Sequence, residues 1–210
     1  MSEFNSIEEV SQEIKNKLSS NSNKKRILTL YAFNGTWKTR ISNEFNLLNE
    51  KFDPIYDEPE EFDKVEEWKE INKKVLCYNA FLEDLFRWDN EEYILYFDKN
   101  SWEAELIQDE WLELNIIDNF KRFLNTKIEP LFDLNEGQIT FNIASWDDDT
   151  KSEIKISRGE ESIFIWSVFY TIIELVIDEL NTKKEDRSTE LFNNLKFIII
   201  DDPVSSIDDT

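Results

Sequence analysis

The sequence predicts an α/β fold in which a mixed sheet is flanked by helices. Three short, mostly apolar, β-prone runs, 26–32, 74–81 and 196–200, are separated by longer segments with helical spacing. Hydrophobic residues make up 40% of the 210 residues, and 16 Phe and 7 Trp supply the bulk of a core. No internal repeat or low-complexity linker divides the chain, so we expect residues 1–210 to form a single domain.

The N-terminal part predicts a helix, a strand and a second helix. In SIEEVSQEIKNKLSS, Ser6 can cap a helix and Glu9 can complete a capping box, and apolar residues recur at helical spacing at Val10, Ile14 and Leu18. The strand RILTLYA, 26–32, leads through the turn FNGTW into a helix over about 38–49. The acidic, proline-containing segment 52–70 is expected to be a solvent-exposed loop that leads into a short helix.

The central part predicts two strands and a helix. KVLCYNAF, 74–81, has the composition of a buried strand, and EEYILYFD, 91–98, alternates as a half-buried strand does. Residues 101–125 keep one helical period, with apolar side chains at Leu106, Trp111, Leu112, Ile116, Ile117, Phe120 and Phe123.

The C-terminal part predicts a hairpin, a central helix and a last strand. QITFNIAS and SEIKIS are expected to pair across WDDDT. The segment from Gly159 to Leu180 is apolar on almost every side, which is typical of a helix in the middle of a domain. KFIII, 196–200, has the composition of a fully buried strand, and Asp201 and Asp202 follow it.

Composition excludes several classes of function. The net charge of −22, from 46 acidic and 24 basic residues, disfavours nucleic-acid binding, because that affinity comes largely from phosphate neutralisation. The sequence has no histidine, which excludes Ser–His and Cys–His nucleophile pairs and histidine-ligated metals. One cysteine, Cys77, favours a reducing compartment, and no segment resembles a signal peptide or reaches the length of a membrane span. We expect a cytoplasmic protein with no direct contact to nucleic acid or membranes.

The stretch YAFNGTWKTR, 31–40, is a candidate phosphate-binding loop. A P-loop has the pattern G-x-x-x-x-G-K-[ST], in which backbone N–H groups surround the phosphates, the lysine reaches the β- and γ-phosphates, and the hydroxyl holds Mg²⁺. Lys38 and Thr39 stand at the last two positions, but Ala32 and Trp37 replace the two glycines. An ordinary strand–turn–helix junction accounts for the same residues.

A second candidate is the acidic end of the last strand, in FIIIDDPVSSIDD. In open α/β sheets, ligands bind at the carboxyl ends of the strands. Asp201 is placed to hold Mg²⁺, directly or through water, and Asp202 to orient or deprotonate an attacking water. An acidic turn accounts for the two carboxylates, but not for the specific loop from Pro203 to Asp208.

The third candidate is ISRGEES, 156–162, immediately before the apolar helix. Ser157 and Gly159 at a helix N-terminus would combine a hydroxyl, free N–H groups and the positive end of the helix dipole into an anion site. A simple N-cap with Glu160 and Glu161 in the first turn accounts for the same residues.

In this order, the three motifs resemble those of an ABC-type ATPase head of the SMC-like branch. More narrowly, they resemble the AAA_13-type ATPases of anticodon nucleases and related bacteriophage-defence proteins. There the nucleotide loop is similar to AFNGTGKT, the signature to LSxGE, and the Walker B motif and D-loop to IDDPVSSLD; this chain has AFNGTWKT, ISRGE and IIDDPVSSID. The resemblance covers most of the chain, rests on roughly thirty motif residues, and implies a P-loop NTPase fold with ATP and Mg²⁺ as ligands.

The resemblance implies roles for individual residues on the nucleotide side. Lys38 would bind the phosphates, and Thr39 and Asp201 would hold Mg²⁺. Asp202 stands where transporters have the catalytic glutamate. Asn79, after the second strand, is a candidate for the glutamine-loop position.

The resemblance also implies a second subunit. Ser157 and Gly159 would contact the γ-phosphate of a nucleotide held by a partner head, and Asp208 would lie in the D-loop across that interface. The partner would be a second copy of the chain, in a nucleotide-dependent homodimer, or a related ATPase or effector subunit. The expected nucleotide contacts are therefore Asn34, Gly35, Thr36, Trp37, Lys38, Thr39, Ser157, Gly159 and Asp208.

Three departures from the family pattern bear on activity. Trp37 places a large ring where the helix and the phosphates need a residue without Cβ. The chain stops at Thr210, directly after the D-loop, and it lacks the switch histidine. A nuclease or other effector part is absent. We expect an incomplete head, whether as a fragment, a truncated gene product or a decayed paralogue.

Two functions are therefore in competition. The first is an ATP-binding head that dimerises around nucleotide and acts as the sensor or motor of a bacterial phage-defence system. The alternative is a head-like protein, impaired in nucleotide binding, that acts as a regulatory interaction module. An acidic DNA mimic would explain the charge but not the ordered motifs. Trp37 is the residue that discriminates between the first two.

Overall fold

The computed structural model describes residues 4–19, 28–29, 40–45, 74–79, 85–143 and 153–201. The chain divides into two compact units, one from Met1–Asn79 with Thr182–Asp201, the other built on Ala80–Asn181. Each unit has helices and strands, which agrees with the predicted α/β class. That residues 1–210 act as one domain stays a prediction. Among the described residues, no helix has the length and apolarity needed to cross a membrane.

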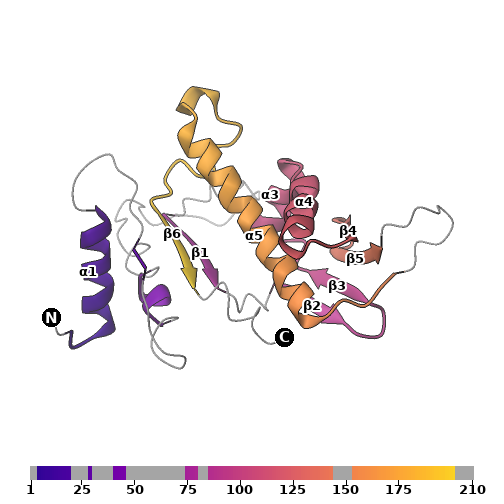
Figure 1. Cartoon of the computed structure of the whole chain (residues 1–210). Helices are drawn as coiled ribbons and strands as arrows, with labels where there is room; N and C mark the ends of the chain where they lie inside the picture. The colour runs from indigo at the N-terminus through magenta and orange to yellow at the C-terminus, as the bar shows by residue number, and fades with distance from the viewer. Residues whose placement is uncertain are drawn as a thin grey trace, which may run out of the picture. The chain divides into compact units, whose positions relative to one another are not determined.

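The first unit contains two parallel strands. β1 (Val75–Asn79) and β6 (Phe197–Asp201) pair from Val75 opposite Phe197 to Asn79 opposite Asp201 (Figure 1). The predicted strands 74–81 and 196–200 therefore share a sheet. Of the third predicted strand, 26–32, only two residues are described, and neither is assigned to a strand.

The N-terminal helix α1 (Ile7–Ser19) confirms the helix predicted from Ser6 onward. The hydroxyl of Ser6 accepts the N–H of Glu9 at 3.2 Å, as an N-cap does. The Glu9 carboxylate accepts the N–H of Asn5 at 2.9 Å, so the capping box closes one residue earlier than the usual pattern.

Residues 40–45 are helical, within the helix predicted for 38–49. Phe45 is buried, and its ring packs edge-to-face on Phe197 of β6 with the ring centroids 5.1 Å apart. The helix that follows the candidate phosphate loop is thus packed against the strand that ends at Asp201.

The second unit is a four-stranded antiparallel sheet with helices on one face. β2 (Phe86–Asp89), β3 (Ile94–Phe97), β4 (Ile128–Asp133) and β5 (Gln138–Ile143) lie in the order β2-β3-β5-β4 (Figure 1). The helices are α3 (Trp102–Asp109), α4 (Glu113–Leu124) and α5 (Arg158–Asn181). α5 confirms the central helix predicted over 159–180.

Phe164 of α5 lies at the centre of this core. Its side chain is fully buried, and its ring contacts aromatic rings from two edge strands, one inner strand and a second helix: Phe86 of β2, Phe132 of β4, Phe141 of β5 and Phe120 of α4. Three of these four contacts are edge-to-face, a favoured geometry for aromatic pairs. One side chain thus joins the helical layer to the sheet.

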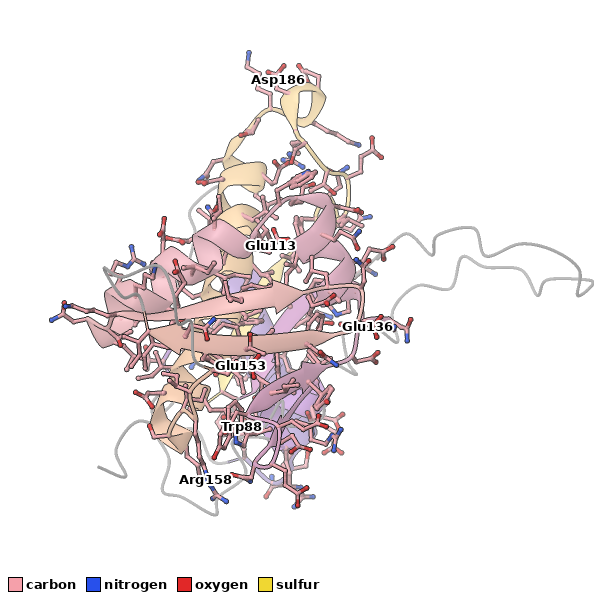
Figure 2. All side chains as sticks on the ribbon, turned by 90° about the vertical axis from the view of Figure 1, so that its right-hand side faces the viewer. Trp88, Glu113, Glu136, Glu153, Arg158 and Asp186 are labelled. Carbon is pink, nitrogen blue, oxygen red and sulfur yellow. The ribbon has the colours of Figure 1, made fainter. Side chains whose placement is uncertain are left out.

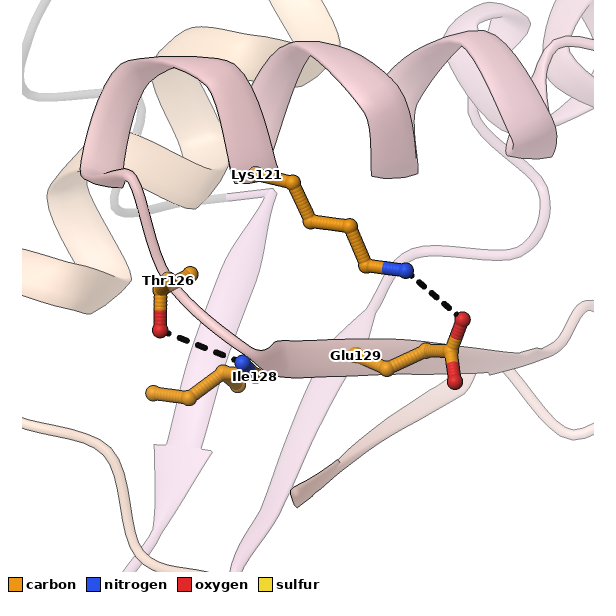
Figure 3. A network of polar contacts seen from close by, with 4 residues as sticks. All are labelled: Lys121, Thr126, Ile128 and Glu129. Carbon is orange, nitrogen blue, oxygen red and sulfur yellow. Dashed lines mark hydrogen bonds and ion pairs between the residues drawn. The ribbon is translucent and has the colours of Figure 1, made fainter. Parts of the chain in front are cut away.

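The connection from α4 to β4 is built from local polar contacts. Asn125 ends α4 in the left-handed conformation at φ 48°, and the hydroxyl of Thr126 accepts the N–H of Ile128 at 3.1 Å (Figure 3). The ammonium of Lys121 and the carboxylate of Glu129 then form an ion pair at 2.8 Å across the turn (Figure 3). Because this pair is half-exposed, its contribution is orientation more than stability.

Several predicted elements of this unit need correction. The single helix expected over 101–125 is two helices, because the backbone turns left-handed at Trp111, φ 55°. β5 pairs with β4 along its whole length, which was not predicted. Of the hairpin predicted between QITFNIAS and SEIKIS, the described residues show one antiparallel bridge, Glu153 to Asn142, and a hydrogen bond from the N–H of Ile154 to the carbonyl of Phe141 at 2.8 Å. The strand predicted at 91–98 is β3, but its partner β2 was not predicted.

Truncating the central aromatic residue tests the role of Phe164. We expect Phe164→Ala to lower the free energy of unfolding by about 3–5 kcal/mol, because it removes a buried ring and leaves a cavity. Ile177→Ala is the control on the same helix: that side chain is exposed, and we expect a loss below about 1 kcal/mol. Urea unfolding followed by circular dichroism measures both; equal losses would contradict a central role for Phe164.

Candidate functional site

The carboxyl edge of the β1–β6 pair carries Asp201. Its side chain is 6% exposed, and its Oδ2 atom is buried without a hydrogen-bond partner in the described part of the chain. Asn79 ends β1 directly opposite it, because the two strands are parallel and in register. Tyr78, one residue earlier, is buried as well; burial raises its pKa to about 12, so the phenol stays neutral at physiological pH.

An unpaired, buried carboxylate oxygen is costly unless a donor or a cation reaches it. Mg²⁺ in nucleotide sites is held by one or two carboxylates, with phosphates and water completing its shell. The orphaned oxygen of Asp201 fits that role. The described residues contain no group of three Asp, Glu, Cys or His side chains able to hold a metal ion by themselves, so further ligands would have to come from elsewhere.

The predicted phosphate-loop residues, 34–39, lie outside the described residues, as do Asp202 and Asp208. Their proposed roles therefore stay predictions. Of the predicted site residues, the structure places Asp201 in the first unit and Ser157 and Gly159 in the second.

The start of α5 is a closed capping box. The hydroxyl of Ser157 accepts the N–H of Glu160 at 3.3 Å, and the N–H of Ser157 donates to the Glu160 carboxylate at 2.6 Å. The carbonyl of Ser157 accepts the N–H of Glu161 at 2.9 Å. The N-cap interpretation of Ser157 therefore holds in this chain. The role of Glu160 could have been predicted from the S-x-x-E spacing of the sequence.

Gly159 is a different case, because nothing among the described residues requires a glycine there. Its backbone is not left-handed, and a Cβ built on it would meet nothing nearer than the Ser157 hydroxyl at 4.0 Å. Arg158, beside it, is exposed and points away from the sheet (Figure 2). The N-terminus of α5 thus has open space over Gly159.

A polar network holds α5 against α4 further along. The amide of Asn119 donates to the Thr171 hydroxyl and to the Glu174 carboxylate, both at 2.9 Å. The hydroxyls of Thr171 and Ser167 each donate to a carbonyl one turn earlier in α5, at 2.8 and 2.7 Å. Because the amide and both hydroxyls are buried and satisfied, the network fixes how α5 is rotated and how far it is shifted along α4. None of these three positions was predicted as functional.

These features define an α/β protein with a buried aspartate at the end of a parallel strand pair. Its long helix α5 is capped by a serine and has open space beside a glycine in its first turn. The chain is similar to a protein named anticodon nuclease from Escherichia coli, with 43% identity over 193 residues, 88% of this chain and 48% of the relative. The chain thus spans about half the length of that curated relative. No protein-family model matches the chain, and no solved structure matches it.

Replacing Gly159 tests whether the chain itself needs that glycine. We expect Gly159→Ala to leave the free energy of unfolding unchanged or to raise it by up to about 1 kcal/mol, because alanine is the better helix former. Gly137→Ala is the matched control: Gly137 has φ 67°, and a Cβ there would lie 2.7 Å from the carbonyl oxygen of Phe97. That variant should lose more than about 1 kcal/mol in thermal unfolding. A comparable loss in Gly159→Ala would show an internal requirement.

Neutralising Asp201 tests the ion site. We expect Asp201→Asn to raise stability in the absence of Mg²⁺ by about 1 kcal/mol, because an amide is less costly to bury than a carboxylate charge. Millimolar Mg²⁺ should raise the melting temperature of the original chain and have little effect on the variant. Asp186→Asn, an exposed change in the short 3₁₀ helix η2 (Lys184–Asp186), is the control. Equal Mg²⁺ responses in all three proteins would contradict the site.

Proposed function

We propose that this chain is the ATPase-head part of an anticodon-nuclease-like protein of bacterial phage defence. In this proposal, two heads close on Mg²⁺-ATP and so act as a sensor or motor for an effector. The observation that carries it is the buried oxygen of Asp201, which has no partner among the described residues and lies at the carboxyl edge of parallel strands, in a chain similar to an anticodon nuclease.

The nucleotide side of the proposal rests on what surrounds β6. The strand ends at Asp201, and the helix after Lys38 and Thr39 packs on it through Phe45 and Phe197. A P-loop NTPase holds phosphates and Mg²⁺ between the loop before such a helix and an acid-ended strand, and the described helix 40–45 and β6 supply the last parts of that arrangement. Bound Mg²⁺ would neutralise phosphate charge; Asp201 would help to hold it, and Asp202 would orient the attacking water.

The partner side of the proposal rests on α5. Ser157 and Gly159 are at an exposed to half-exposed helix N-terminus, where the helix dipole favours an anion. The open space over Gly159 allows close approach of a phosphate from another subunit. The capping box has a consequence for this step: the Glu160 carboxylate already accepts the Ser157 N–H, so a phosphate would have to displace it or share the cap.

The alternative is a regulatory interaction module with impaired nucleotide binding. Two observations favour it: Trp37 in the candidate loop, and a Ser157 cap that is satisfied without any ligand. Both functions share the same fold, and they differ in whether ATP binds.

Calorimetry with Mg²⁺-ATP on the original chain and on Trp37→Gly separates the two. We expect weak or absent binding in the original chain, because a ring at position 37 distorts the loop at a cost of about 1–3 kcal/mol or fills the nucleotide space. A distortion cost of about 1–3 kcal/mol corresponds to a roughly ten- to hundred-fold loss of affinity, whereas a ring in the nucleotide space would abolish binding. Trp37→Gly should restore binding with little change in melting temperature without ligand.

Lys38→Ala, added to Trp37→Gly, is the control and should remove the restored binding. Light scattering of Trp37→Gly should then show a dimer with ATP and a monomer without it, and adding Asp202→Asn should prolong the dimer. Micromolar affinity in the original chain would contradict the impaired-loop prediction and leave a plain ATPase. No binding in Trp37→Gly would favour the interaction module.

A further inference from the structure

The corner between α3 and α4 is closed by a Schellman cap with an unusual residue in it. The N–H of Leu112 donates to the carbonyl of Ile107 at 3.0 Å, and the N–H of Trp111 donates to that of Gln108 at 3.4 Å. These are the two hydrogen bonds of the motif, whose left-handed position is normally glycine. Trp111 occupies that position at φ 55°.

Neither the backbone nor the core accounts for a tryptophan at this position. A left-handed conformation is strained for a residue with a Cβ atom, because the Cβ crowds the following carbonyl oxygen. The side chain gains little from burial, because it is 80% exposed, while the neighbouring Leu112 is buried. Leu114, in the first turn of α4, is 72% exposed. Two large apolar side chains thus face solvent at one corner.

The charges around this corner are all negative along the chain. From Asp109 to Asp118 there are four carboxylates and no basic residue; the carboxylates are Asp109, Glu110, Glu113 and Asp118. Glu113 lies at the start of α4, on the side of the unit that faces the viewer in Figure 2. An exposed apolar centre with Trp, bordered by charge, has the composition of an interface hot spot with its polar rim.

The negative charge of this corner determines which class of binding partner is complementary to it. Carboxylates repel the phosphates of nucleic acids and of anionic membranes. A second copy that docked through the same corner would bring like charges together. A protein surface with lysine or arginine around an apolar pocket is complementary, and a guanidinium can stack on the indole face.

We propose that the α3–α4 corner, defined as Trp111, Leu114 and the four carboxylates, is a docking surface for a basic protein partner. The partner presents an apolar pocket for Trp111 and arginine or lysine side chains to the rim. None of these residues is among those assigned to nucleotide, so the proposal does not rest on ATP binding.

A random peptide library, displayed on phage and selected on the full chain, provides the probe. We expect enriched peptides to combine arginine or lysine with apolar residues. Binding of the synthetic peptides, measured by fluorescence polarisation, should weaken at least tenfold in Trp111→Gly and in Leu114→Asn, and it should weaken with added salt. Trp111→Gly should melt at the same or a higher temperature, because glycine suits the left-handed position, so loss of binding would not reflect unfolding.

Tyr93→Gly is the matched control. Tyr93 is also an aromatic residue at positive φ, 57°, and is 39% exposed, but it lies in the turn between β2 and β3. This variant should bind the peptides as the original chain does. Selection of acidic peptides, of peptides that bind Trp111→Gly equally well, or of none would overturn the proposal. A dimer in light scattering that Trp111→Gly abolishes would overturn it in favour of a second copy as occupant.

Discussion

The aromatic contacts of Phe164 are the interaction on which the second unit depends. Its ring meets rings from β2, β4, β5 and α4, so the sheet and two helices converge on one side chain. Phe164 lies only two turns into α5, and the same contacts therefore fix the N-terminal end where Ser157 and Gly159 are. The buried bonds of Asn119 hold the helix again further along, so its start cannot shift independently of the sheet.

The two described parts of the candidate site are opposite in character. At Asp201 a buried carboxylate oxygen has no partner among the described residues, so a cation or a donor from elsewhere would stabilise it. At Ser157 the hydroxyl, N–H and carbonyl are all satisfied within the chain. Asp201 therefore calls for a cation or a hydrogen-bond donor. The start of α5 has open space above Gly159, but an anion that binds there would have to displace the Glu160 carboxylate from the Ser157 N–H.

Strong periodicity and composition made several elements predictable from the sequence: α1, α5, β1 and β6 lie where apolar spacing or apolar runs placed them. β4 was missed because Pro130 interrupts its pattern, and proline is tolerated there because β4 is an edge strand. The break at Trp111 was missed because a large apolar residue continues the helical period while its backbone departs from it. In the site, motif order made Asp201, Ser157 and Gly159 candidates, and the S-x-x-E spacing from Ser157 to Glu160 was enough to predict the closed cap that the distances show.

The connectivity of the parallel pair has a consequence for how the protein folds. β1 ends at Asn79 and β6 begins at Phe197, so the entire antiparallel unit lies between two strands that must meet. The hairpin contacts of that unit are local and close quickly, whereas the parallel pair needs a long loop to be closed first. We expect the edge that carries Asp201 to form late, after the second unit has shortened the distance between its ends. On a ribosome, this edge cannot form until β6 has emerged, long after β1 has been made.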